Sequence, residues 1–130
     1  MKRYVIDSSA WIEYFDGSPL GKRVAAIVED PDAEIATCVI SIAEMAAFYT
    51  AKNIEFPMIK KILISLSTMY AASFAFCEEA GMIYPQLRQK HPKISFFDVF
   101  VLLTARKLHA KVLTKDTDFA GIKDAEVLSD

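Results

Sequence analysis

The sequence predicts an α/β fold, in which helices flank a mainly parallel sheet of four or five strands. Short apolar runs, such as residues 4–6 and 111–114, alternate with longer segments whose apolar residues recur at helical spacing. Parallel strands need long crossover connections, which are usually helices, and this alternation supplies them. Hydrophobic residues make up 53% of the 130 residues and charged residues 25%, which supports one folded domain spanning residues 1–130.

The individual elements follow from this alternation. Strands are expected where a short apolar run is bounded by turn-forming or charged residues, and helices where a longer run has one apolar face. We expect strands at 4–6, 34–39, 70–74 and 111–114, and a short strand at 126–128. We expect a first helix capped by Ser8 or Ser9 and ended by residues 16–19, and further helices at 20–29, at 41–53, from 57, at 78–90 and from 95.

Serines and prolines mark where several of these helices begin. Ser41 and Glu44 have the S-x-x-E spacing of a capping box, and Ser95 opens a nearly identical pattern. Pro57 suits the first position of a helix, where its missing N–H costs nothing. Pro85 lies inside the segment 78–90, so we expect it to bend or split that helix.

Charge and cysteine content exclude several classes of protein. The formal net charge of −2 argues against a protein held to nucleic acid by global charge alone, although an acidic site with basic residues around it remains compatible. Cys38 and Cys77 form no C-x-x-C pair and the chain has two histidines, so a structural zinc site is not expected. The longest uncharged stretch, 62–77, is shorter than the roughly 18 apolar residues of a membrane span. We therefore expect a soluble cytoplasmic protein.

Four acidic residues stand where the active groups of a parallel α/β fold collect. Asp7 directly follows the first expected strand and Asp116 follows the fourth, while Glu44 and Asp98 lie in the first turns of two helices. Because the carboxyl ends of parallel strands meet at one edge of the sheet, this topology permits all four side chains to converge there.

Capping or turn formation explains each of these acids taken alone. Together they carry more weight, because Asp98 has phenylalanines before it and an apolar run after it, where an unpaired carboxylate is costly. Converging carboxylates repel one another, so either their pKa values rise or a cation lies between them. An all-oxygen acidic cluster suits a hard divalent cation, Mg²⁺ or Mn²⁺.

Four segments, in order and spacing, resemble the PIN domain, and most of all the VapC-type toxins of prokaryotic toxin–antitoxin pairs. They are Tyr4-Val-Ile-Asp-Ser-Ser-Ala-Trp-Ile-Glu-Tyr-Phe15, Ser41-Ile-Ala-Glu44, Ser95-Phe-Phe-Asp98 and Leu113-Thr-Lys-Asp-Thr-Asp-Phe119. The resemblance spans nearly the whole chain, and the ordered set is more specific than any one motif. It implies a PIN-like three-layer sandwich.

The resemblance also implies an activity and a set of site residues. It implies a Mg²⁺- or Mn²⁺-dependent endoribonuclease that cleaves single-stranded or looped RNA and leaves a 5′-phosphate. The acidic quartet, both catalytic and metal-binding, would be Asp7, Glu44, Asp98 and Asp116. Polar support would come from Ser9, Thr114 and Asp118, and the sequence leaves open whether Asp116 or Asp118 binds the metal directly.

Partners follow from the same resemblance and from the distribution of basic and aromatic residues. Candidate RNA contacts are the basic residues nearest to the acids: Arg88, Lys90, Lys93 and Lys115. The resemblance implies a VapB-like antitoxin protein. We also expect a homodimer, because the first three helices carry more large apolar residues than a small core readily encloses: Trp11, Tyr14, Phe15, Leu20, Phe48 and Tyr49.

Three other functions are alternatives to the ribonuclease. A phosphoacceptor domain would have adjacent acids near the N-terminus, and a haloacid dehalogenase-like phosphatase would have D-x-D after the first strand, where this chain has Asp7-Ser8-Ser9. A non-catalytic PIN-like binding module is the serious rival. Such a module would usually have lost part of the quartet, and this chain keeps all four acids.

Overall fold

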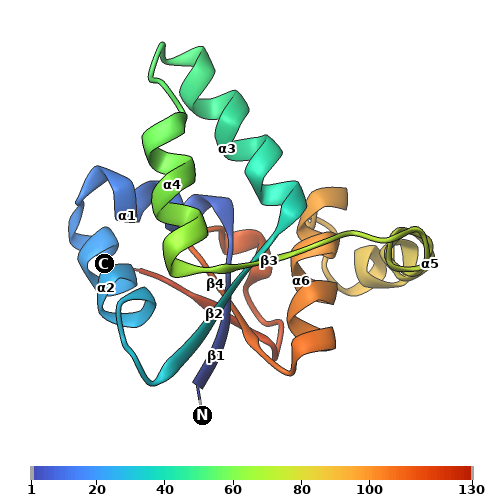
Figure 1. Ribbon diagram of the computed structural model, residues 1–130. Coiled ribbons are helices and arrows are strands. Elements are labelled where there is room, and N and C mark those ends of the chain that lie inside the picture. The colour runs from blue at the N-terminus through green and yellow to red at the C-terminus, as the bar shows by residue number, and fades with distance from the viewer. Residues whose placement is uncertain (1, 130) are drawn as a thin grey trace.

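A single parallel sheet organises the computed structural model, which describes residues 2–129 (Figure 1). Its strands lie in the order β3-β2-β1-β4-β5, and every neighbouring pair is parallel. Strands β2 and β3 are added on one side of β1, whereas β4 and β5 are added on its other side. The direction of winding therefore reverses between β1 and β4. In open α/β sheets the crevice at such a reversal, at the carboxyl ends of the strands, is the usual ligand site. The strands are β1 (Lys2–Ile6), β2 (Ala33–Cys38), β3 (Thr68–Tyr70), β4 (Lys111–Thr114) and β5 (Ala125–Val127).

Helices cover both faces of this sheet, which confirms the predicted α/β sandwich. Side chains alternate between the faces of a strand, so Val5 belongs to the core beneath α5 and α6 while Ile6 belongs to the core beneath α1 and α2. Figure 1 shows these two layers, with α3 and α4 rising beyond the sheet. The helices are α1 (Ser8–Asp16), α2 (Pro19–Val28), α3 (Val39–Ala51), α4 (Pro57–Leu66), α5 (Phe74–Lys90) and α6 (Phe96–Leu108), with a 3-10 turn, η1 (Thr117–Phe119).

Helix α3 begins two residues earlier than the sequence predicted, and the expected capping box at its start is wrong. Strand β2 runs directly into the helix, and Cys38 occupies the N-cap position without a side-chain hydrogen bond. Ser41 therefore lies inside the helix, where it is buried, and its hydroxyl has no hydrogen-bond partner within residues 2–129. No turn-forming residue separates strand from helix, so the local pattern placed the boundary too late.

Two other boundaries differ around α5. Strand β3 ends at Tyr70, and α5 already begins at Phe74, because the Ser73 hydroxyl accepts a hydrogen bond from the backbone N–H of Phe76. Pro85 does not split the helix, which continues to Lys90. The Pro85 side chain is exposed, so the ring lies on the solvent side and the loss is that of one backbone hydrogen bond.

The large apolar residues of the first three helices are mostly core, which corrects the expected interface. Trp11, Leu20 and Tyr49 are buried, and the indole Nε1 of Trp11 donates a hydrogen bond of 3.0 Å to the Thr37 hydroxyl. Within residues 2–129 the exposed large apolar side chains are instead Val39, Ile54, Met58, Ile64, Phe74, Met82, Phe96 and Phe97. None of the helices in this part of the chain has the length and apolar character of a membrane span.

Candidate metal centre

Asp7 is positioned by the pairing of the two central strands. Its backbone N–H donates a hydrogen bond of 2.9 Å to the carbonyl of Leu113, which extends the pairing of β1 with β4 by one residue. The side chain is buried, and its Oδ2 accepts hydrogen bonds from Thr114 Oγ1 at 2.7 Å and from Ser9 Oγ at 3.0 Å. Ser9 and Thr114, both predicted as supporting residues, thus fix the orientation of this carboxylate.

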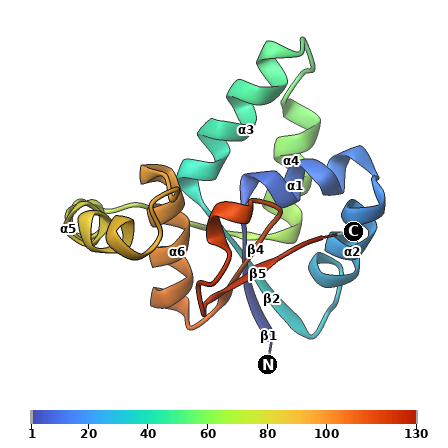
Figure 2. The same cartoon turned by 180° about the vertical axis from the view of Figure 1, so that it is seen from behind.

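The loop after β4 brings two more acids to the same place. The backbone N–H of Asp116 donates to Thr114 Oγ1 at 2.9 Å, and that of Asp118 donates to Asp116 Oδ1 at 2.8 Å. The N–H of Lys115 donates to Ser9 Oγ at 3.0 Å, which ties the loop to the first turn of α1. Figure 2 shows η1 between the starts of α1 and α6, above the carboxyl ends of the strands.

Asp98 reaches the centre from the first turn of α6. The predicted capping box is present: the Ser95 N–H donates to Asp98 Oδ2 at 2.9 Å, and the Asp98 N–H donates to Ser95 Oγ at 3.1 Å. The residue is nevertheless buried, so capping alone leaves one oxygen of a buried carboxylate free for another partner.

Glu44 comes from α3 and is the least constrained of the four. It is half-buried, and its side-chain partner is the Ser8 hydroxyl, at a long 3.5 Å from Oε1. Helix α3 leaves the carboxyl end of β2, which carries Glu44 to the same edge of the sheet as Asp7 although no capping box forms.

The pKa values of Asp7, Glu44 and Asp98 are raised, in part by the negative charge of neighbouring carboxylates. Burial, followed by the negative charges of Asp7, Asp98 and Asp116, raises the pKa of Glu44 to about 7. Burial also raises the pKa of Asp98 to about 6, against the hydrogen bonds from Ser95 and with a smaller contribution from Asp7 and Asp116. The pKa of Asp7 is raised chiefly by burial. Repulsion of this kind requires that the groups lie close together.

Asp118 belongs to the centre as closely as Asp116 does. Carboxylate oxygens of Asp98, Asp116 and Asp118 all lie within 4.8 Å of one another. The sequence indicated Asp118 only as a supporting residue, because nothing in a D-x-D pattern tells which acid turns inward. The structure brings both to Asp98, so both can contribute an oxygen to one ion.

The charge of this centre is not balanced by the protein. Within residues 2–129 no lysine or arginine forms an ion pair with Asp7, Glu44, Asp98 or either acid of the β4 loop, and Lys115 Nζ contacts Glu13 instead, at 3.5 Å. Five converging carboxylates offer the hard oxygen ligands that Mg²⁺ and Mn²⁺ prefer. The residues present therefore fit a divalent cation.

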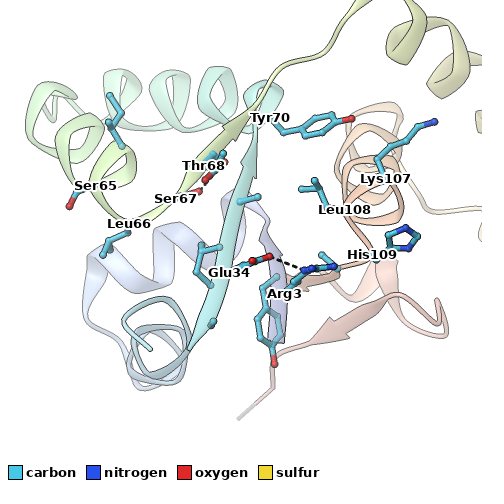
Figure 3. A pocket seen from close by; sticks show the side chains of 16 residues that line it. Arg3, Glu34, Ser65, Leu66, Ser67, Thr68, Tyr70, Lys107, Leu108 and His109 are labelled. Atoms are coloured by element: carbon cyan, nitrogen blue, oxygen red, sulfur yellow. Dashed lines mark hydrogen bonds and ion pairs between the residues drawn. The ribbon is translucent and has the colours of Figure 1, made fainter. Parts of the chain in front are cut away.

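A cavity of about 810 Å³ lies elsewhere and has a different chemistry (Figure 3). It is lined by residues of β1, β2 and β3 and by the ends of α4 and α6. Arg3 and Glu34 form an ion pair of 2.8 Å across it, and Lys107 and His109 lie on its wall. None of the five clustered carboxylates lines it, so the cavity is not the candidate metal centre.

The predicted RNA contacts lie in two places. Arg88 and Lys90 are exposed in the last turn of α5, and Lys93 is exposed in the loop that leads into α6. The Arg88 guanidinium donates to the Tyr84 hydroxyl at 2.9 Å and to the carbonyl of Ile94, four residues before Asp98, at 3.5 Å. Lys115 lies beside Asp116 but is paired with Glu13.

Comparisons with known proteins agree with this fold. The family model described as the PIN domain matches residues 4–125. A toxin–antitoxin complex from Klebsiella pneumoniae contains a chain that is 22% identical, with a TM-score of 0.71 over 95% of this chain and 96% of that one. VapC20 of Mycobacterium tuberculosis, described as a toxin that cleaves the sarcin–ricin loop, is 18% identical, with a TM-score of 0.72 over 97% and 99% of the two chains. VapBC2 of Rickettsia felis, bound to a promoter DNA fragment, gives 17% identity and a TM-score of 0.69 over 97% of each chain. A sequence search of curated proteins finds no significant match.

Proposed function

The chain belongs to the PIN domain family, and on that premise we propose that it is a Mg²⁺- or Mn²⁺-dependent endoribonuclease, the toxin of a toxin–antitoxin pair. One observation carries this proposal: buried and half-buried carboxylates from the end of β1, α3, α6 and the β4 loop converge at the crossover of the sheet, without a lysine or arginine of the described residues to balance them. Structural use alone does not account for such a concentration of negative charge, because it costs folding free energy.

Each carboxylate has a part in the proposed reaction. A divalent ion, when bound, supplies a water of lowered pKa and positive charge near the scissile phosphate. Asp7, Glu44, Asp98 and Asp116 hold that ion, with Asp118 as a further ligand, and Ser9 and Thr114 keep Asp7 in a single orientation. Hydrolysis would add a water oxygen to phosphorus and break the bond from phosphorus to the 3′ oxygen, which would take a proton from water, so the products would carry a 5′-phosphate and a 3′-hydroxyl. No side-chain nucleophile takes part.

The cleavage test compares the wild-type protein with two variants. Purified protein is incubated with RNA in Mg²⁺, in Mn²⁺ and in EDTA. We expect cleavage only with metal, loss of cleavage in Asp7→Asn, and retained cleavage in Asp32→Asn, whose side chain is exposed at the opposite edge of the sheet. Metal affinity is measured alongside by calorimetry. RNA binding without cleavage by the wild type would favour the non-catalytic binding module instead.

We also propose an antitoxin partner and a homodimer. The similar structures from Klebsiella pneumoniae and Rickettsia felis are toxin–antitoxin assemblies. An antitoxin segment with an Arg or Lys near the acidic centre would meet favourable charge there and compete with the metal. Because Trp11 and Tyr49 are core residues, the dimer surface would use the partly buried Phe15 and Phe48 or exposed apolar residues such as Met58. Light scattering and a pull-down from the native host test the two proposals separately.

A further inference from the structure

Two phenylalanines are exposed immediately beside the acidic centre. Phe96 and Phe97 form the first turn of α6 and directly precede Asp98, yet their side chains are 44% and 51% exposed. Large apolar side chains that stay exposed next to a polar site commonly mark a binding surface. Their position, one and two residues before a proposed metal ligand, places that surface at the edge of the proposed catalytic centre.

Among the described residues, the ring of Phe96 packs against other aromatic rings, whereas the ring of Phe97 does not. Phe96 packs edge-on against Tyr84, with ring centroids 5.0 Å apart, and lies 5.4 Å from the ring of Phe100. Within residues 2–129 no aromatic ring pairs with Phe97. We call Tyr84, Phe96 and Phe97 the aromatic strip.

The chain segment that carries the aromatic strip is positively charged. Residues 81–97 contain Arg88, Lys90 and Lys93 and no Asp or Glu, in a chain whose net charge is −2. None of these three basic residues takes part in an ion pair within the described residues. The Arg88 guanidinium is fixed 5.7 Å from the centre of the Tyr84 ring. Aromatic rings next to unpaired basic residues form the combination that binds single-stranded nucleic acid.

We propose that the exposed ring of Phe97 stacks on an unpaired base next to the scissile phosphate, while Arg88 contacts the phosphate backbone. The inference rests on the proposed ribonuclease function and assigns to Phe97 and Arg88 the contacts with the nucleotide beside the cleavage site. A phosphate at the carboxylates carries its own sugar and base, so an adjacent nucleotide passes over the first turn of α6. Bases within an RNA duplex are not free to leave the stack for such a ring.

Binding measurements test this proposal independently of cleavage. Single-stranded RNA that contains 2-aminopurine, and an abasic ribose-phosphate oligomer of equal length, are titrated with protein in Ca²⁺. Base–aromatic stacking is worth about a 5- to 150-fold change in affinity per base. We expect Phe97→Ala to lose affinity for the base-bearing RNA by that factor and to keep its affinity for the abasic oligomer. In the wild type, 2-aminopurine fluorescence should be quenched on binding.

Three further variants separate stacking from other effects. Phe97→Trp should restore affinity because it keeps a π face, whereas Phe97→Leu keeps apolar bulk and should not. Phe74→Ala is the matched control, since Phe74 is 87% exposed at the start of α5. Thermal melts check that each variant is folded.

The outcomes distinguish this inference from the proposed function. Equal affinity of wild type and Phe97→Ala for base-bearing RNA overturns the stacking role even if the wild type cleaves RNA. An equal loss on both oligomers, together with a change of mass in light scattering, assigns Phe97 to a protein interface and also overturns it. If the wild type cleaves no RNA but shows base-dependent binding through Phe97, the ribonuclease proposal fails and the stacking surface stands.

Discussion

Replacing Glu44 by Gln should stabilise the metal-free protein, and only at high pH. The pKa of Glu44 is raised from 4.5 to about 7 by burial and by the neighbouring carboxylates. A raised pKa means that the folded state disfavours the ionised form, so the penalty is absent below about pH 4.5 and complete above about pH 7. At about 1.4 kcal/mol per pKa unit the penalty is a little over 3 kcal/mol, and partial exposure reduces it to roughly 2 kcal/mol.

The assay is thermal unfolding in EDTA at pH 5 and at pH 8. A stabilisation of roughly 2 kcal/mol corresponds to an increase in Tm of about 5–10 °C for Glu44→Gln over wild type at pH 8. At pH 5 the difference should shrink to a degree or two, because Glu44 is then largely protonated in the folded protein. Mg²⁺ should raise the Tm of the wild type more than that of the variant. Glu55→Gln, exposed in the α3–α4 connection, is the control and should change little.

Two results would refute this reasoning. A Glu44→Gln variant that is less stable than wild type at pH 8 would show that the carboxylate makes a favourable contact in the free protein. An equal difference in Tm at both pH values would show that ionisation is not the cause. Either result would also weaken the case for mutual repulsion in the acidic centre.

Three more predictions concern the site and its supports. Asp98→Asn should abolish metal-dependent cleavage while the fold stays intact or gains stability, since the amide oxygen can still accept a hydrogen bond from the Ser95 N–H. Cleavage rates measure the activity and thermal melts measure the stability. Unchanged cleavage would leave Asp98 only its capping role. Thr114→Val removes the donor to Asp7 and the acceptor for the Asp116 N–H, so unfolding free energy should fall by about 1–3 kcal/mol and calorimetric metal affinity should drop. Trp11→Phe leaves the buried Thr37 hydroxyl without the indole donor, and urea unfolding should show a loss of about 1–3 kcal/mol without weaker metal binding.

The sequence predicted those parts of the centre that depend on strand ends and local caps. Asp7 and Asp116 follow buried apolar runs, which mark strand ends in any parallel sheet, and the Ser95–Asp98 box is a purely local pattern that the structure confirms. Glu44 was predicted at the same edge of the sheet because its helix starts there, and the capping box was the alternative explanation for it. It reaches the centre because α3 continues from the carboxyl end of β2, and no capping box is involved.

Other features depend on contacts between distant segments and left no local signal. The adjacency of β1 and β4, which brings Thr114 to Asp7, depends on the strand order. A run of apolar residues predicts a strand but does not indicate which strands lie beside it. The burial of Trp11 likewise depends on Thr37, which provides a partner for the indole N–H from another strand. From the sequence alone, a core position and an interfacial position were both open for so large an aromatic residue.

The insertion of β4 between β1 and β5 has a consequence for how the protein is made. Synthesis proceeds from the N-terminus, so Asp7, Glu44 and Asp98 exist in the growing chain before the last central strand has been added. Until residues 111–118 follow, Asp7 lacks the Thr114 hydroxyl, and Asp98 lacks Asp116 and Asp118. A nascent or prematurely ended chain thus carries most of the acidic residues in an unassembled form. Under the proposed ribonuclease function, a chain that ends before residue 111 would therefore lack an assembled centre.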